Sequence, residues 1–128
     1  MENHIRLIFT SKHLSPDKIV KAIGVQGDKV WASGDKRNNS KIIETENGLI
    51  VNSRLEKSLD IGLHIESIMD LIDGNEGKLM KFSETPDCEI QLSCAIYCRS
   101  APPLNFEKAI TSWIGSMGAS LDIDIYFI

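Results

Sequence analysis

Two aspartates near the C-terminal end have the spacing that best suits chemistry. Asp122 and Asp124 are separated by one residue in a stretch where apolar and polar residues alternate, which predicts a β-strand over residues 121–127. Alternate residues of a strand project from the same face, so the two carboxylates should lie about 7 Å apart. Such a pair can hold a cation or divide the roles of general acid and base. It can also keep a sheet face soluble, or pair with Arg6 if the first and last strands are adjacent.

The remaining residue types predict no metal site, no cofactor site and no nucleophile. A hard cation needs about six oxygen ligands, and no third carboxylate is evident beside the aspartate pair. The three histidines are scattered and lack the spacing of metal ligands. Cys94 and Cys98 share a strand face with aliphatic residues and should be buried, whereas Cys88 at the strand start should be exposed. We therefore predict no metal and no cofactor, and we favour a non-enzymatic function.

A strand and a capped helix open the chain. Alternation predicts the strand over residues 4–9. Ser15 can cap the free N–H groups of the following helix, and Pro16 suits its first turn. Gly24 can end this helix in a left-handed conformation. With the short strand that follows, this part of the chain predicts a β-α-β unit.

Trp31 lies in that short strand and has two plausible roles. It is either a core side chain or an exposed anchor of the kind that dominates interfaces. The polar residues 33–40 then predict a loop. Glu46-Asn47-Gly48 separates two apolar runs, and Asn-Gly tolerates positive φ, so a β-hairpin is predicted over residues 42–51.

A second β-α-β unit follows two central helices. Apolar spacing predicts helices over residues 59–73 and 78–82. A strand from Cys88 to Cys98 then precedes a helix capped by Asn105, and the final strand closes the unit. We therefore predict one α+β domain over residues 1–128. Its sheet should be mostly antiparallel, with helices on one face in a ferredoxin-like arrangement that would suit an internal pseudo-duplication.

Several short motifs carry a resemblance that covers nearly the whole chain. They are Trp31 with Gly34-Asp35, Leu63-His64-Ile65, Leu92-Ser93-Cys94 with Tyr97, and the terminal Ser120-Leu121-Asp122-Ile123-Asp124-Ile125-Tyr126. In these residues the chain resembles the bacterial family known as domain of unknown function 4279. The resemblance implies an α+β fold and a bacterial origin. It implies no catalytic residue, because that family has no established activity.

Composition and charge limit the classes of partner. The formal net charge is −4, and the most basic stretch, Lys36-Arg37 with Lys41, falls in the polar loop. Nucleic acid is therefore not a predicted partner. No apolar run approaches the roughly 20 residues that span a bilayer, and the N-terminus does not have the pattern of a signal peptide. The odd set of three cysteines suits a reducing compartment, so a cytoplasmic location is predicted.

These observations favour a non-enzymatic protein-binding module, for example an immunity protein that blocks a basic toxin. An acidic domain associates faster with a basic protein partner through electrostatic steering. The predicted binding surface is the polar sheet face, with Arg6, Trp31, Asp122, Asp124 and Tyr126. The alternative is a small-molecule-binding or enzymatic domain that uses Asp122 or Asp124 in a cleft beside the 33–40 loop. The oligomeric state is left open by the sequence.

Overall fold

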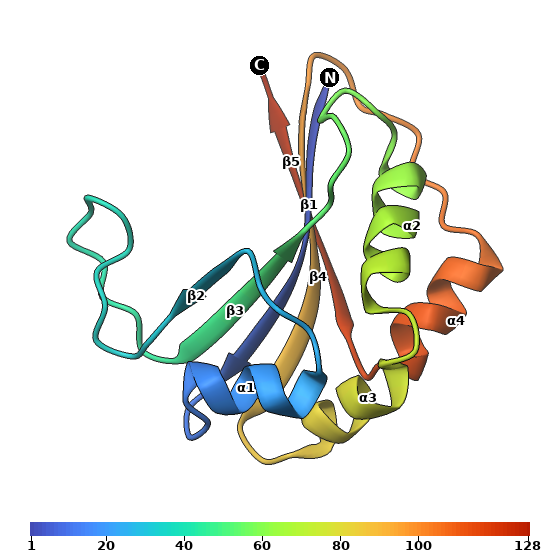
Figure 1. Ribbon diagram of the computed structural model, residues 1–128. Coiled ribbons are helices and arrows are strands. Elements are labelled where there is room, and N and C mark those ends of the chain that lie inside the picture. Colours follow the sequence, from blue (N-terminus) through green and yellow to red (C-terminus); the bar gives the residue numbers. More distant parts are fainter.

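The computed structural model describes all residues 1–128 as a five-stranded sheet with four helices on one face (Figure 1). This arrangement confirms the α+β class. The strands are β1 (Glu2–Ser11), β2 (Lys29–Trp31), β3 (Asn47–Asn52), β4 (Cys88–Cys98) and β5 (Ser120–Phe127). The helices are α1 (Pro16–Ile23), α2 (Ile61–Ile72), α3 (Glu76–Glu84) and α4 (Lys108–Ser116). None of the helices is long and apolar enough to cross a membrane.

The strand order is β2-β3-β1-β4-β5, and only β4 and β5 are parallel neighbours. The sheet is therefore mixed, with antiparallel pairing elsewhere. β1 and β2 run in the same direction but are separated by β3, whereas β4 and β5 are adjacent. The two predicted β-α-β units thus differ in their geometry, which gives no support to a pseudo-duplication.

Alternation in β1 sorts its side chains between the two faces of the sheet. Ile5, Leu7 and Phe9 are buried in the core beneath the helices, and the residues between them are only partly buried. The helices complete this core with side chains at helical spacing: Ile19 and Ile23 of α1, and Ile65, Ile68 and Ile72 of α2. The face without helices (Figure 1) is here called the open face, and it carries the partly buried side chains of β1, namely His4, Arg6, Ile8 and Thr10.

Local capping chemistry sets the ends of α1 and the start of α2. Ser15 Oγ accepts a hydrogen bond from the Lys18 amide, and Gly24 ends α1 with a φ of 72°, both as predicted. At α2, Asp60 Oδ1 accepts a hydrogen bond from the Leu63 amide at 2.9 Å. Each cap satisfies an N–H group that has no partner within the helix.

The predicted cap of the last helix, Asn105, is wrong. α4 begins at Lys108, and Glu107 holds the capping position. Phe106 packs against the core, which keeps the residues before α4 in an irregular segment. Asn105 therefore lies too far from the first helical turn to cap it.

The hairpin predicted around Glu46-Asn47-Gly48 is also wrong. Asn47 and Gly48 lie inside β3, which pairs with β2 across the long connection formed by residues 32–46. Gly48 faces Trp31, whose indole occupies the space that a Cβ would need. Glycine is required here by the close approach of a side chain, and no turn is present at this position.

β5 contributes less to the core than its alternation predicts. It is an edge strand that pairs only with β4. Ile123 is half-buried against the core, but Leu121, Ile125 and Phe127 are exposed, the last to 66%. The edge position explains this exposure, because an outer strand has a neighbour on one side only.

Candidate functional site

Arg6 lies near the middle of the open face with no charged partner. Its neighbours in register are Asn52 of β3 and Ser93 of β4. The side chain is half-buried, and its buried Nε donates no hydrogen bond. A guanidinium offers five N–H donors, and leaving a buried donor unpaired is costly. Arg6 is thus a cation in the sheet centre whose hydrogen-bonding capacity is not used by the fold.

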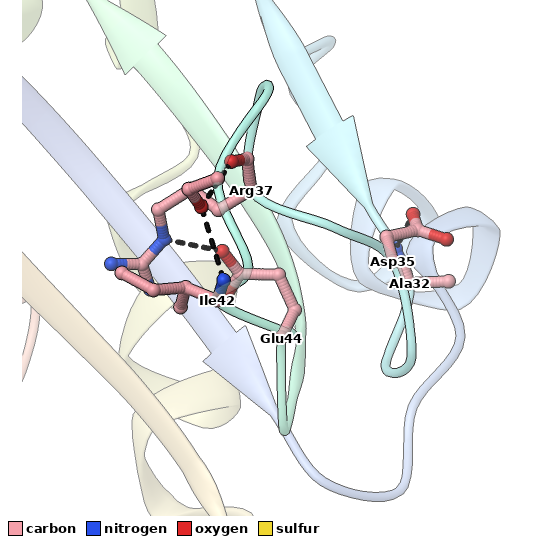
Figure 2. A network of polar contacts seen from close by, with 6 residues as sticks. Ala32, Asp35, Arg37, Ile42 and Glu44 are labelled. Carbon is pink, nitrogen blue, oxygen red and sulfur yellow. Dashed lines mark hydrogen bonds and ion pairs between the residues drawn. The ribbon is translucent and has the colours of Figure 1, made fainter.

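The long connection between β2 and β3, called the 32–46 loop, stands beside the open face (Figure 1). Its backbone is ordered by hydrogen bonds from Gly34 N to Glu44 O and from Arg37 N to Ile42 O, both 2.8 Å long. Asp35 Oδ2 accepts a further hydrogen bond from Ala32 N at 2.8 Å (Figure 2). These contacts order the backbone of the loop, so that it can form one wall of a cleft.

A cleft of about 420 Å³ lies between this loop and the sheet. Four cations line it, namely Arg6, Lys29, Lys36 and Arg37, together with two acids, Glu44 and Glu46. The lining therefore has an excess of two positive charges on a chain whose net charge is −4.

One of these cations is neutralised within the loop. Arg37 Nε donates to Glu44 Oε1 at 2.7 Å, and a second bond joins Arg37 Nη2 to Glu44 Oε2 at 3.3 Å (Figure 2). This pairing raises the pKa of Arg37 and lowers the pKa of Glu44. Arg6, Lys29 and Lys36 make no ion pair. They are free to attract an anion into the cleft.

Trp31 forms an apolar wall of the same cleft. Its indole lies over Gly48, and its buried Nε1–H has no hydrogen-bond partner. The residue is half-buried, so it is neither a full core side chain nor a freely exposed anchor. The cleft therefore combines a flat aromatic surface with three cations that make no ion pair.

The other predicted binding residues lie at the opposite edge of the open face. Asp122 pairs in register with Ser93, which itself faces Arg6, so β4 separates the arginine from the aspartate. Pairing of Arg6 with Asp122 required adjacent first and last strands, and that arrangement is absent. Neither Asp122 nor Asp124 lines the cleft beside the loop. No group of three or more potential metal ligands surrounds them.

Tyr126 belongs to an aromatic cluster at this β5 edge. Its ring stacks on Tyr97 with centroids 4.9 Å apart, and Tyr97 meets the ring of His4 edge-to-face at 5.3 Å. Asp122, Asp124 and Tyr126 thus form a separate acidic and aromatic strip, called the β5 strip.

The cysteines are all free and buried. Cys94 and Cys98 lie in the core as predicted, but Cys88 is only 6% exposed, so its predicted exposure is wrong. Cys88, the first residue of β4, pairs in register with Ser11, the last residue of β1, and its thiol lies 3.3 Å from Ser11 Oγ. Burial, with a smaller contribution from Asp122, raises the pKa of the Cys94 thiol to about 12. A thiol with this pKa is a poor nucleophile.

Ser53 and His64 form a polar pair that the sequence reading does not identify. Ser53 Oγ lies 2.6 Å from His64 Nδ1 and also accepts a bond from the Leu55 amide, so its hydroxyl hydrogen points to the imidazole. Burial lowers the pKa of His64, which favours the neutral acceptor. His64 pairs with no carboxylate that could orient it for catalysis. We assign the pair to tethering the segment after β3 onto α2.

Several cleft residues have only a weak sequence signal. Lys29 precedes the predicted short strand, Lys36 lies in the predicted polar loop, and Glu44 lies in the predicted hairpin. The one available signal is loop length, because connections longer than about 12–15 residues are often functional. A correct strand assignment for Asn47 would have revealed a loop of that length.

Comparison with known proteins gives a family and no closer relative. No curated protein sequence and no solved structure is significantly similar to the chain. The family model described as "Domain of unknown function (DUF4279)" matches residues 1–128. The chain therefore belongs to this family, whose description names no activity.

Proposed function

We propose that this domain is a non-enzymatic binding module that takes an anionic ligand into the cleft beside the 32–46 loop. The observation that carries the proposal is the half-buried Arg6, whose Nε has no hydrogen-bond partner and whose guanidinium makes no ion pair. A stable sheet does not require such a residue, because a buried donor without a hydrogen-bond partner lowers the stability of the fold. An anion that binds there would satisfy it.

The arrangement of the cleft defines the ligand chemistry. A planar guanidinium binds a carboxylate or phosphate through two parallel hydrogen bonds. Lys29 and Lys36 add two unpaired positive charges, and Trp31 offers a flat surface. The ligand should therefore carry a carboxylate or phosphate group next to a flat or apolar part. A small molecule and an acidic side chain of a partner protein share this chemistry.

A binding role is favoured over catalysis by the state of the acids in the cleft. The Arg37 hydrogen bond lowers the pKa of Glu44, so this residue stays ionised and is a poor general acid. Asp122 and Asp124, the sequence-based candidates for acid and base, line no part of the cleft. The residues that do line it can attract and orient an anion.

Titration of tryptophan emission tests the proposal. In a Trp113→Phe background Trp31 is the only tryptophan, and the probes are inorganic phosphate, citrate and phenyl phosphate. Hydrogen bonds to charged groups contribute about 1.5–3 kcal/mol, so Arg6→Gln should weaken binding by roughly 10- to 150-fold. Arg99→Gln is the matched control, because Arg99 is exposed and lies outside the cleft.

Two outcomes would refute the anion site. One is the absence of a saturable response to any of the three probes in the parent protein. The other is an equal response of the Arg6→Gln and Arg99→Gln proteins. Thermal unfolding of both variants shows whether a variant that gives no response is still folded.

A second candidate is protein binding at the β5 strip. It is favoured by Asp122 and Asp124, which make no ion pair, and by Tyr126, which is stacked yet exposed. This strip would suit a basic protein partner, as expected of an immunity protein that blocks a basic toxin. A stoichiometric partner captured by the parent protein and lost with Asp122→Asn/Asp124→Asn supports this function. Retention of that partner by the double variant would exclude the strip.

Two further features belong to the proposal. The free, buried thiols support a cytoplasmic location, where reducing conditions keep cysteines unpaired. The β1-α1-β2-β3-α2-α3-β4 part, with strand order β2-β3-β1-β4, supports the ferredoxin-like arrangement, in which α3 is an extra helix before β4 and to which α4 and β5 would be an addition. An experimental structure tests the second point.

A further inference from the structure

The outward face of α2 carries leucines where a surface helix normally carries polar residues. Ile65, Ile68 and Ile72 fill the inward face and are buried in the core. Leu63 and Leu71 on the outward face are 43% and 37% exposed. A helix that covers a sheet needs one apolar face, so folding does not account for these two exposed leucines. Exposed apolar side chains that gather in one place mark interaction sites.

Two clefts meet at Leu63. The first, about 460 Å³, lies between the start of α2 and residues 102–107, with Leu104 in its wall. The second, about 410 Å³, runs along α2 as far as Leu71. Both are lined by Leu63 and Glu66, so the two clefts adjoin at these residues, and together they are called the α2 groove. Figure 1 shows α2 and the segment before α4 side by side in the helical layer.

The charged side chains along the α2 groove are almost all acidic. Asp60, Glu66 and Glu107 line the first cleft, which has no lysine or arginine in its lining. Glu66 and Asp70 line the second, whose one cation, Arg54, is already held in an ion pair. None of the four carboxylates makes an ion pair. An occupant must therefore offer positive charge beside apolar surface.

We propose that the α2 groove docks a cationic amphipathic helix of a partner protein. Such a helix inserts apolar side chains at spacings of three and four residues into a groove. Its Lys or Arg side chains would reach the carboxylates on either side of Leu63. Leu63 and Leu71 are about 12 Å apart along the helix axis at the helical rise per residue, which matches about two turns of a docked helix.

The same charges argue against other occupants. A two-fold interface places one patch against its own copy, so Glu66 and Asp70 would face like charges in a homodimer. Anionic lipid headgroups would be repelled for the same reason. The groove lies in the helical layer, on the other side of the sheet from Arg6, so this proposal does not depend on the anion site.

The first test uses a fluorescent synthetic peptide of roughly 18 residues, about five helical turns, with leucine on one face and lysine on the other. Its control peptide has the same composition in scrambled order and therefore no apolar face. Fluorescence anisotropy should show at least about tenfold tighter binding of the amphipathic peptide, because anchoring contacts require that face. Equal affinities of the two peptides would overturn the proposal.

Variants locate the binding surface. Leu63→Ser should weaken peptide binding by about tenfold, and Glu66→Gln with Asp70→Asn should weaken it and flatten its salt dependence. Glu84→Gln removes an exposed carboxylate at the end of α3 and should change nothing. If Leu63→Ser lowers the melting temperature, the Glu66→Lys variant is used in its place, because Glu66 is exposed and outside the core. Binding that survives these variants, or that falls equally with Glu84→Gln, would overturn the proposal.

Backbone amide NMR shifts of the full chain give an independent map. Peptide binding should move resonances of α2 and residues 102–107. Shifts confined to Asp122, Asp124 and their neighbours would place the cationic peptide on the β5 strip, and the α2 groove would be excluded.

Discussion

Gly48→Ala tests the packing that shapes the aromatic wall of the cleft. Gly48 faces Trp31 across the β2–β3 pair, and a Cβ at this position would overlap the indole. Its φ is not in the left-handed region, so alanine suits the backbone itself. Overpacking costs about 1–3 kcal/mol, whereas replacing a strand glycine with alanine gains about 0.5–1 kcal/mol. We expect the free energy of unfolding to fall by about 1 kcal/mol and by no more than about 2.5 kcal/mol.

Removal of the indole separates the two contributions. In a Trp31→Ala background the indole that the new methyl group would overlap is removed, so Gly48→Ala should stabilise the protein by about 0.5–1 kcal/mol. The difference between the two backgrounds is a coupling energy of about 1–3 kcal/mol. Urea unfolding followed by circular dichroism measures all four proteins of this cycle, because it does not depend on tryptophan emission.

A matched glycine provides the control for this cycle. Gly115 lies in α4, and a Cβ there would meet no atom within 4 Å. Gly115→Ala should therefore stabilise the protein by up to about 1 kcal/mol through helix propensity alone. A coupling energy near zero between Gly48 and Trp31 would refute the packing, and with it the shape of the cleft wall.

Three further predictions concern pH, thiol chemistry and helix capping. A hydrogen bond from Arg54 lowers the pKa of Asp28 below its ordinary 3.8, although burial opposes the shift. This stabilisation is complete above the unfolded-state pKa and is lost as pH falls through the lower folded-state value. The urea midpoint of the parent protein should therefore fall more steeply below about pH 4 than that of Asp28→Asn, and parallel curves would contradict this. Because the pKa of the Cys94 thiol is about 12 and all three thiols are buried, Ellman's reagent should label the native protein slowly and the urea-unfolded protein rapidly. A fast phase in the native protein would show that the thiols are accessible. Asp60→Ala should cost about 1 kcal/mol by removing the α2 cap, whereas Asn105→Ala should leave the thermal midpoint unchanged. Equal losses from these two variants would show that the caps are misassigned.

The elements that the sequence predicts well are those set by neighbouring residues. Ser15 and Gly24 mark the ends of α1, and the structure has both contacts. Alternation in β1 and β4 predicts which side chains enter the core, and Leu7, Phe9 and Leu92 are fully buried. Capping bonds and strand alternation act over a few residues, so local sequence contains the information that they need.

Asn47-Gly48 shows where local reading fails. The dipeptide is a strong turn signal, yet its glycine lies in β3 because Trp31 needs the space. The two residues are 17 positions apart (48 − 31), and only the pairing of β2 with β3 brings them together. Glycine occurs both in turns and where a side chain approaches the backbone closely, so the local segment does not show which of the two roles it has.

The candidate site divides in the same way. The sequence predicts Arg6 and Trp31 as binding residues, and the structure places both in one cleft. It also groups Asp122 with them, but β4 separates that aspartate from β1. The cleft depends on the path of the 32–46 loop, which no short-range pattern predicts.

The sequence by itself determined the α+β class, the helical and extended segments with local end signals, and the two faces of the long strands. The tertiary structure decided the order of the strands, the neighbours of Arg6 and the exposure of β5. The physical reason is the range of the interactions. Periodicity and capping involve residues within one or two turns, whereas strand order follows from which distant apolar faces can be buried together. The position of β3 between β1 and β2 depends on such long-range contacts, and it creates the cleft.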